Sequence, residues 1–405
     1  MRPVGGATPM RPGGMREHNL AVVLGEVARQ QPVSRARVAA ATGLTKTTVS
    51  ALVADLVRDR LVTQAEAVRG QGDRGRPGSG LSLDGDHVAA LGCEISVDRL
   101  AVSVLDLRMR QRVRLERWAD NRRDPMTVLG EISGLAAEAV RLAGEQGLSV
   151  VGATVAVPGL LDRASSRITV APNLGWHDVP LDHRWSVLGA AALPTQVDNE
   201  ANLAAIGELR LGAGTLYDSF MLVTGEVGIG AGLVIDSALH SGAGGYAGEL
   251  GHVVVTPDGD LCGCGARGCL ETVAGKEALL RAAGLDPRDG LRPLIEGVGS
   301  GEPRALAAVD AAARALAVAL AAAVNLLDPG AIILGGPLAA IGPRLLDTLE
   351  TNLAARLRNL RGSAPPVLAS ALGDDSAVLG GAVAVLDAVV ADPGPVMRRA
   401  GRPDG

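Results

Sequence analysis

The sequence predicts two joined units of different class: a small winged helix-turn-helix at the N-terminus and a larger α/β part in which helices cover mixed sheets. Near the N-terminus, apolar residues recur at the spacing of amphipathic helices. After residue 84, strand-like runs alternate with helical patterns, which is typical of sheets covered by helices. The chain has 405 residues, 47% of them apolar and 20% charged, so it is long enough for several cores and too apolar to be disordered.

The first predicted elements are three helices. The first has one apolar stripe, at i, i+3, i+4 and i+7, formed by Leu20, Val23, Leu24 and Val27. Pro32 ends that helix, and Ser34 can cap a second one over 35–41. Thr45 can cap a third, whose buried face consists of Val49, Leu52, Val53, Leu56 and Val57. Two short helices joined by a glycine-containing turn are typical of a helix-turn-helix.

A two-stranded wing is predicted next. The runs 61–63 and 81–83 resemble paired strands, and the segment between them is basic, polar and glycine-rich. We expect the winged module to span 15–84, after a Gly/Pro-rich tail, 1–14, that is disordered.

The charge distribution indicates that any polyanionic partner would bind this module. Residues 1–84 hold 12 Arg and Lys against 7 Asp and Glu, whereas the rest of the chain holds 27 against 37. Polar residues at the start of the third helix lie where a recognition helix reaches base edges, and arginines nearby would contact phosphates or the minor groove. The predicted DNA-binding residues are Arg35, Arg37, Lys46, Thr47, Ser50, Arg74 and Arg76. The alternatives are solvated surface charges and a helix-turn-helix that serves only for dimerisation.

The larger part begins after Asp84. Its expected strands are 88–97, 100–107, 150–157, 192–197, 219–224, 230–235 and 331–334, and its expected helices are 126–146, 199–211 and 305–327. The longest apolar run, 315–324, is too short and too rich in alanine to span a bilayer, and no signal peptide is predicted. We therefore expect a cytoplasmic protein with no membrane partner.

A cysteine cluster is the sharpest local signal. Cys262, Cys264 and Cys269 follow His252, with glycines between the cysteines that let a short loop fold back on itself. Three thiolates and one imidazole make a closed four-coordinate site, which is typical of structural zinc. The alternative is three buried free cysteines; Cys93 stands alone and is expected in the core. The clustering does not fit a disulfide framework.

A set of polar residues in this apolar sequence predicts a sugar site. Asn and Glu bind neighbouring hydroxyls through paired donor and acceptor contacts, and isolated buried carboxylates are costly without such partners. The set is Asn173, Asn199, Glu200, Glu249, His252 and Glu271. Taken singly, each is better explained as a helix cap or surface residue, so the prediction rests on the set.

Longer motifs connect these residues. They include Gly248-Glu-Leu-Gly-His252 and Cys262-Gly-Cys-Gly-Ala-Arg-Gly-Cys-Leu-Glu271, and further ones at 157–159, 172–176, 198–202, 325–329 and 334–336. Together they resemble the signature of the ROK family (repressors, open reading frames and sugar kinases). The resemblance covers nearly the whole chain from about residue 88, and the N-terminal helix-turn-helix matches the repressor branch of the family.

The resemblance implies an actin/hexokinase-like (RNase H-like) ATPase fold with two lobes and a sugar cleft between them. Lobe 1 would span 85–197, with 374–400 packing back on it, and lobe 2 would span 198–373 and carry the zinc loop. The six polar residues would line the cleft. His252 would bind structural zinc through one ring nitrogen and face a sugar hydroxyl with the other.

Departures from the kinase pattern favour a regulator over an enzyme. Family kinases carry Asp-x-Gly-Gly-Thr in the first hairpin, where this chain has Glu94-Ile-Ser-Val-Asp98. Side chains at Ser96 and Val97 would obstruct phosphate and Asp98 would repel it. In the second phosphate loop, Gly225-Glu-Val-Gly-Ile-Gly230, the Glu226 carboxylate adds negative charge. Glu200 takes the place of the kinases' general base, a change that alone would preserve proton abstraction with shifted geometry. We expect zinc and no ATP.

The expected function is sequence-specific transcriptional regulation, by repression of carbohydrate-metabolism genes, with DNA binding modulated by a sugar or phosphosugar. The expected partners are double-stranded operator DNA and further copies of the chain, as a homodimer or homotetramer, because one winged module makes few DNA contacts. Two alternatives stay open. One is an active ATP-dependent sugar kinase with a fused DNA-binding head, and the other is a regulator sequestered by a protein partner such as a transporter component.

Overall fold

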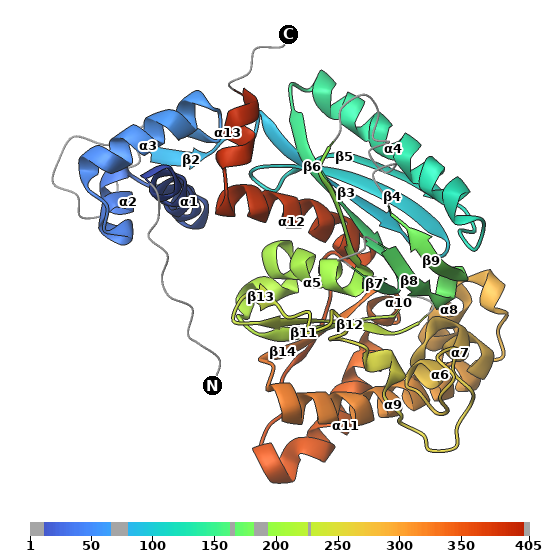
Figure 1. Cartoon of the computed structure of the whole chain (residues 1–405). Helices are drawn as coiled ribbons and strands as arrows, with labels where there is room; N and C mark the ends of the chain where they lie inside the picture. The colour runs from blue at the N-terminus through green and yellow to red at the C-terminus, as the bar shows by residue number, and fades with distance from the viewer. Residues whose placement is uncertain (1–11, 66–79, 163–166, 182–192, 226–227, 401–405) are drawn as a thin grey trace, which may run out of the picture.

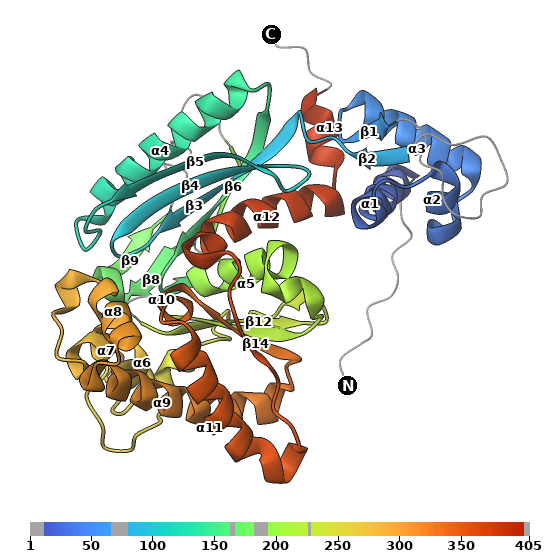
Figure 2. The same ribbon diagram turned by 180° about the vertical axis from the view of Figure 1, so that it is seen from behind.

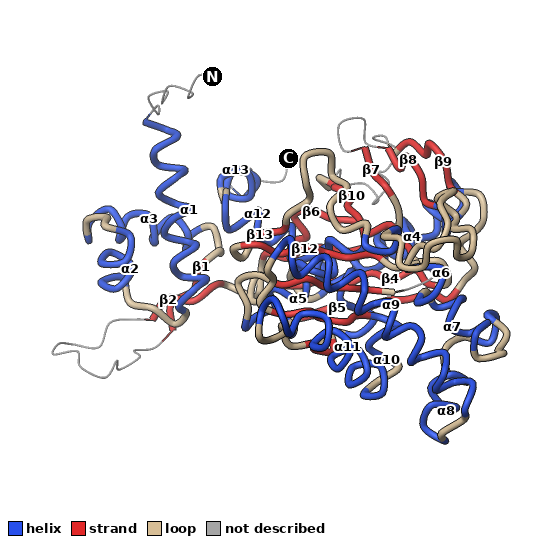
Figure 3. Tube along the Cα trace, turned by 90° about the horizontal axis from the view of Figure 1, so that it is seen from below, coloured by secondary structure: helices blue, strands red, loops and turns tan. Residues whose placement is uncertain are grey.

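The computed structural model describes residues 12–65, 80–162, 167–181, 193–225 and 228–400. Figure 1 shows the N-terminal unit at one side of two larger sheets that are stacked with helices between and around them. The view from behind (Figure 2) and the view from below (Figure 3) show that the N-terminal unit lies beside α12 and α13.

The N-terminal unit is a winged helix-turn-helix. Its elements are α1 (Pro12–Gln30), α2 (Arg35–Thr42), α3 (Lys46–Arg58), β1 (Val62–Ala65) and β2 (Gly80–Leu83). Both predicted caps form, since Ser34 Oγ accepts from Arg37 N at 3.3 Å and Thr45 Oγ1 accepts from Thr48 N at 3.1 Å. The two strands pair antiparallel, as expected of a wing. Helix α1 begins at Pro12, so Pro12–Gly14 of the predicted tail are helical, and the rest of that tail lies outside the described residues.

The first lobe is built on a five-stranded mixed sheet. In the order β10-β6-β3-β4-β5, its strands are Thr195–Asn199, Ser149–Val157, Val88–Ile95, Arg99–Asp106 and Gln111–Trp118. Helix α4 (Pro125–Glu145) contacts β4 and β5, and α12 (Ser376–Ala391) contacts β3 and β6 on the other face (Figure 1). A small sheet of β7 (Leu160–Asp162), β8 (Arg167–Ala171) and β9 (Trp176–Pro180) adjoins it, with η1 (Pro172–Leu174). Strand β10 starts later than predicted, after Pro194, which has no N–H to donate.

The second lobe contains a second five-stranded sheet. In the order β13-β12-β11-β14-β15, its strands are Ala238–Leu239, Gly230–Ile235, Phe220–Thr224, Ala331–Gly335 and Val367–Ala369. Phe220, Leu222 and Val234 pack against α5 (Glu200–Leu211), whereas Met221 and Val223 belong to the core beneath α9 and α11. The helices of this lobe are α6 (Glu271–Ala274), α7 (Lys276–Ala282), α8 (Arg292–Ser300), α9 (Pro303–Leu327), α10 (Gly336–Ala340) and α11 (Pro343–Arg361). The remaining elements are the short η3 (Ala213–Leu216), η4 (Leu250–His252), η5 (Pro287–Asp289) and η6 (Gly373–Asp375) and the C-terminal α13 (Gly394–Ala400).

Helix α9 is longer than the predicted apolar run. Its 25 residues, with a mean hydropathy of 1.8, are long and apolar enough to cross a membrane by length and composition. However, 61% of that apolar window is buried inside the protein, where α9 packs against α11, α6 and α7. The helix therefore has the burial of a core helix.

Helix α12 lies between the two sheets and touches its neighbours through glycines. A Cβ atom added at Gly380 would lie 1.7 Å from Leu203 O of α5, and one at Gly92 of β3 would lie 1.8 Å from Val378 O of α12. The C-terminal half of the same helix shares a hydrophobic cluster with α1 of the winged unit, where Leu386 and Leu24 are both fully buried. One helix therefore contacts both lobes and the N-terminal unit.

Candidate functional site

A cavity of about 740 Å³ opens between the two lobes. All six polar residues predicted for a sugar site line it: Asn173, Asn199, Glu200, Glu249, His252 and Glu271. They come from separate elements, since Asn173 is in η1, Glu200 begins α5 and Glu271 begins α6. The fold therefore brings together residues that are nearly one hundred positions apart in the chain.

Asn199 caps helix α5, the structural role that was the alternative to sugar binding for such a residue. Its Oδ1 atom accepts from Ala201 N at 2.8 Å and from Asn202 N at 3.4 Å, which makes Asn199 the N-cap of α5. Its Nδ2 atom donates to Gly159 O at 3.0 Å. Asn199 thus fixes the start of α5, and with it the backbone of Glu200, whose side chain is largely buried.

Glu271 is held close to the glycine loop before β12. Ile229 N donates to Glu271 Oε2 at 3.3 Å, and a Cβ atom added at Gly228 would lie 2.2 Å from the same oxygen. A side chain at position 228 would therefore require the Glu271 carboxylate to move away from the loop. Glu226 lies outside the described residues, so its predicted effect on phosphate stays a prediction.

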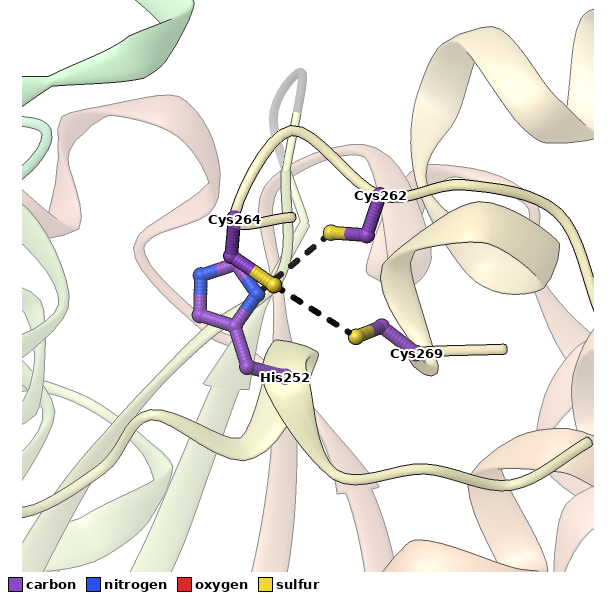
Figure 4. Close-up of side chains that lie close together, drawn as sticks. All are labelled: His252, Cys262, Cys264 and Cys269. Carbon is purple, nitrogen blue, oxygen red and sulfur yellow. Dashed lines mark hydrogen bonds between the residues drawn. The ribbon is translucent and has the colours of Figure 1, made fainter. Parts of the chain in front are cut away.

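The cysteine cluster converges with His252 on one point (Figure 4). The four potential ligand atoms of His252, Cys262, Cys264 and Cys269 all lie within 4.8 Å of one another. Cys264 Sγ is 3.7 Å from Cys269 Sγ, and Cys262 Sγ is 3.6 Å from His252 Nδ1. A tetrahedral zinc ion with Zn–S bonds of about 2.3 Å places its sulfur ligands about 3.8 Å apart, so the geometry fits that ion.

The two ring nitrogens of His252 face different groups. Nδ1 faces the cysteines, whereas Nε2 lies 3.8 Å from Glu249 Oε2 in the cavity wall. Burial raises the pKa of Glu249, an effect that His252 opposes and Glu271 reinforces. Burial likewise raises the pKa of the Cys262 thiol to about 12, so a thiolate there needs a cation to stabilise it.

The cavity is acidic. Its acidic lining residues are Asp198, Glu200, Glu249, Asp260, Glu271 and Glu277. Among the described lining residues, Arg281 is the one arginine and no lysine is present. Arg281 pairs with Glu277 at 3.2 Å on the same helix. Sequence reasoning missed Glu277 and Arg281, because an acidic and a basic residue four positions apart are typical of any exposed helix.

The charges in the first hairpin differ from the prediction that Asp98 would simply repel phosphate. Ser96 and Val97 are buried, and Val97 lines the cavity, but the Asp98 carboxylate is paired with Lys276 Nζ at 3.2 Å. Glu94 is buried and pairs with Arg99 at 2.8 Å. Internal cations therefore already compensate both acidic groups of this hairpin.

The winged unit exposes the polar face predicted for α3. Lys46, Thr47 and Ser50 are exposed, opposite the buried face of Val49, Leu52, Val53 and Leu56. Arg37 is exposed on α2 and Arg35 is half-buried. None of the described acidic residues forms an ion pair with Arg35, Arg37 or Lys46, whereas Arg16 and Arg58 both pair with Asp55. Arg74 and Arg76 lie outside the described residues.

Known proteins match both units. Residues 90–388 match the ROK family, and residues 21–72 match the MarR family. The chain is 27% identical over 375 residues to the xylose repressor of Bacillus subtilis, covering 92% of this chain and 96% of that one.

Two solved structures share the fold. One is a ROK family transcriptional regulator, a homolog of the E. coli MLC protein, with a TM-score of 0.78, 21% identity and coverage of 95% of this chain and 98% of that one. The other is a ROK family glucokinase from Streptomyces griseus with glucose and AMPPNP, with a TM-score of 0.62, 28% identity and coverage of 73% and 98%. The winged helix-turn-helix and the two-lobed actin/hexokinase-like fold are both confirmed, and the chain belongs to the ROK family.

Proposed function

We propose that this protein is a DNA-binding transcriptional repressor of carbohydrate-metabolism genes whose affinity for DNA responds to a sugar in the cavity. The observation that carries the proposal is the physical link between the two units. Helix α12 packs against α5, which begins with Glu200 in the cavity wall, and against α1 of the winged unit. The full-length relation to the Bacillus subtilis xylose repressor supports the same function.

The ligand is held by the six polar residues, with Asn199 acting mainly through its cap of α5. Glu200, Glu249 and Glu271 accept hydrogen bonds from sugar hydroxyls, and Asn173 both donates and accepts. His252 donates from Nε2 when its Nδ1 atom binds zinc. Closure of the lobes around the sugar then displaces α5 and, through their close contact, α12.

An uncharged sugar suits this cavity better than a phosphosugar. Six acidic side chains line the cavity, and Arg281, its one described arginine or lysine, is already paired with Glu277. A phosphate dianion placed there would face several carboxylates at low local dielectric, which is unfavourable.

Zinc is proposed as a structural cofactor. The ion would be held by four ligands, His252, Cys262, Cys264 and Cys269. Four ligands complete the tetrahedral coordination of zinc and leave no position for a substrate. The ion would fix the loop that leads into Glu271, so the sugar site would depend on it.

The protein is proposed to bind sugar without phosphorylating it. In the first hairpin, Ser96 and Val97 carry side chains where family kinases have glycine, and Lys276 and Arg99 are already paired with Asp98 and Glu94. Both cations are thus neutralised by carboxylates rather than available to a phosphate. The second candidate function is that of an ATP-dependent sugar kinase fused to a DNA-binding unit. The similarity of this chain to ROK glucokinases favours it.

Two assays test these functions. In a thermal-shift screen of neutral sugars and phosphosugars, a neutral sugar is expected to raise the melting temperature, and a zinc chelator is expected to abolish that rise. In an ADP-release assay with Mg-ATP and the sugar that binds, we expect no turnover. Turnover that disappears in Glu200→Gln would establish the kinase instead.

Regulation by release from DNA also needs more than one copy of the chain. One winged head makes few contacts, so a homodimer or homotetramer on a two-fold operator is proposed. Sugar-dependent release then requires only a difference in sugar affinity between the DNA-bound and free forms, typically about 1–3 kcal/mol.

A further inference from the structure

We propose that two ion pairs, Asp98–Lys276 and Arg122–Glu277, form a latch that holds the lobes closed over the cavity and thereby sets the affinity of its ligand. The ligand itself is the sugar of the proposed function, on which this inference rests. We call these four residues the latch. Nothing in the motifs that define the sugar and zinc sites includes them.

The latch spans the two lobes with a matched pattern of charge. Lys276 Nζ lies 3.2 Å from Asp98 Oδ2, and a nitrogen of Arg122 lies 3.4 Å from Glu277 Oε1. Asp98 and Arg122 belong to the first lobe, whereas Lys276 and Glu277 are the first two residues of α7 in the second. A negative and a positive group on one side therefore meet a positive and a negative group on the other.

The side of the latch in the first lobe is a single rigid unit. Asn121 is fully buried, and its Nδ2 atom donates to Ser96 O at 2.8 Å and to Arg99 O at 3.1 Å. Backbone hydrogen bonds from Asn121 N to Val97 O and from Ala119 N to Asp98 O complete the connection. Because the hairpin and the segment before α4 are tied together, Asp98 and Arg122 keep a fixed spacing.

The side in the second lobe is connected to the ligand residues. Helix α7 follows α6, whose first residue is Glu271, and Leu279 and Leu280 anchor α7 in the core. Glu277 and, on the opposite side, Val97 both line the cavity. A movement of the lobes that brings Glu271 onto a sugar therefore also brings α7 onto the hairpin.

The latch side chains are partly exposed, so their ion pairs can break and re-form, and a ligand can shift the equilibrium between open and closed lobes. The Lys276 side chain is 19% exposed and that of Asp98 is 49% exposed, so the pair is partly desolvated and still reversible. Such a pair adds little to the stability of either lobe alone. Its attraction acts only when the lobes are together, so it favours the closed state and adds to the apparent affinity of any ligand that binds that state.

Charge reversal and charge exchange test the latch in the full-length protein. The variants are Lys276→Glu, Asp98→Lys and the double exchange Asp98→Lys/Lys276→Asp. The control is Arg292→Glu, which breaks an exposed ion pair to Glu296 within α8 of the second lobe. Affinities for D-xylose and D-glucose are measured by calorimetry, and the radius of gyration is measured by X-ray scattering without ligand.

Each single reversal is expected to weaken binding of whichever sugar the unmodified protein takes by about three- to tenfold, from lost attraction plus new repulsion. It is also expected to enlarge the radius of gyration. The double exchange is expected to restore both quantities, and the control to change neither. Equal affinity and equal size in single variants and unmodified protein, or a double exchange that restores nothing, would overturn the latch.

The scattering measurement separates this inference from the proposed function. If the unmodified protein binds neither sugar and no other sugar in the thermal-shift panel, the proposed function fails. The latch is then still judged by size alone. Raising the salt concentration should expand the unmodified protein and should expand Lys276→Glu less or not at all, because this variant keeps only the Arg122–Glu277 attraction and has a repulsion from Asp98 that salt also screens. Expansion of both to the same extent, or of neither, would contradict the latch.

Discussion

Gly380 of α12 lies directly against the backbone of Leu203 of α5, so close that a Cβ atom at position 380 would be 1.7 Å from Leu203 O. Glu200, at the start of the same α5 helix, lines the cavity, and the far end of α12 packs with the winged unit. With no side chain between the two helices, a shift of α5 has to displace α12.

Substitution of Gly380 by alanine is expected to disturb this contact. The added methyl group meets backbone, which cannot move aside as a side chain can, so unfolding should become easier by about 1–3 kcal/mol. Urea denaturation measures the change. Gly134→Ala is the matched control, because Gly134 lies in helix α4 with nothing within 4 Å of its added Cβ atom. There the substitution should stabilise slightly, by about 0.5–1 kcal/mol. Equal effects at the two sites would contradict the contact.

Loss of the proposed zinc ion is expected to disable the proposed sugar site without unfolding the winged unit. Cys269→Ser should lower the zinc content, measured by elemental analysis, from one ion per chain to near zero, and abolish the thermal shift caused by sugar. Cys93→Ala is the control, since Cys93 is buried in β3 of the other lobe and outside the cluster. Zinc retained by Cys269→Ser would show that the ligand set is wrong.

Substitutions on the winged unit should separate affinity from sequence preference. Lys46→Ala and Ser50→Ala are expected to change which bases are preferred, with a cost of about 1–3 kcal/mol at the affected position. Arg37→Ala and Arg76→Ala should instead weaken all DNA sites alike and reduce the dependence on salt. Binding to a library of sites at two salt concentrations distinguishes the two outcomes. An Arg76 variant with unchanged affinity would count against the wing as a DNA contact.

Asp375 is expected to make the folding stability of the protein depend on pH in the acid range. Burial by itself raises the pKa of Asp375, but hydrogen bonds and charge from Arg114 and Arg99 outweigh burial and lower it below its ordinary value. A lowered pKa in the folded state contributes stability above the pKa of the unfolded chain, near pH 4, and this stability is lost as the pH falls through the folded value. Asp375→Asn should therefore be less stable than the unmodified protein at pH 7. The difference in free energy of unfolding should shrink below about pH 4. A difference that is constant with pH would contradict this role.

The sequence alone predicts the features that depend on nearby residues. The stripe of α1, the caps at Ser34 and Thr45 and the cysteine loop are all encoded within short segments, and each is found as expected. The six polar residues of the cavity are scattered along the chain, so their spacing alone predicts no site, and it is the longer motifs resembling a family that connect them. Charged residues on β5 hide its strand pattern, so it was not predicted.

Contacts between distant residues were not predictable from periodicity or spacing. Asp98 and Lys276 are 178 positions apart, and Arg99 and Asp375 are 276 positions apart. Each of these residues taken alone is typical of an exposed, solvated charge. Their pairing depends on how the lobes and the C-terminal segment pack, which no local pattern records.

The account is tested most directly by the affinity of the full-length protein for its operator, selected from a DNA library, measured by fluorescence anisotropy while a neutral sugar is titrated. We expect the sugar to release the DNA at the concentrations at which it raises the melting temperature, with no ADP formed when Mg-ATP is added. DNA affinity that does not change when the cavity is saturated with sugar would contradict it.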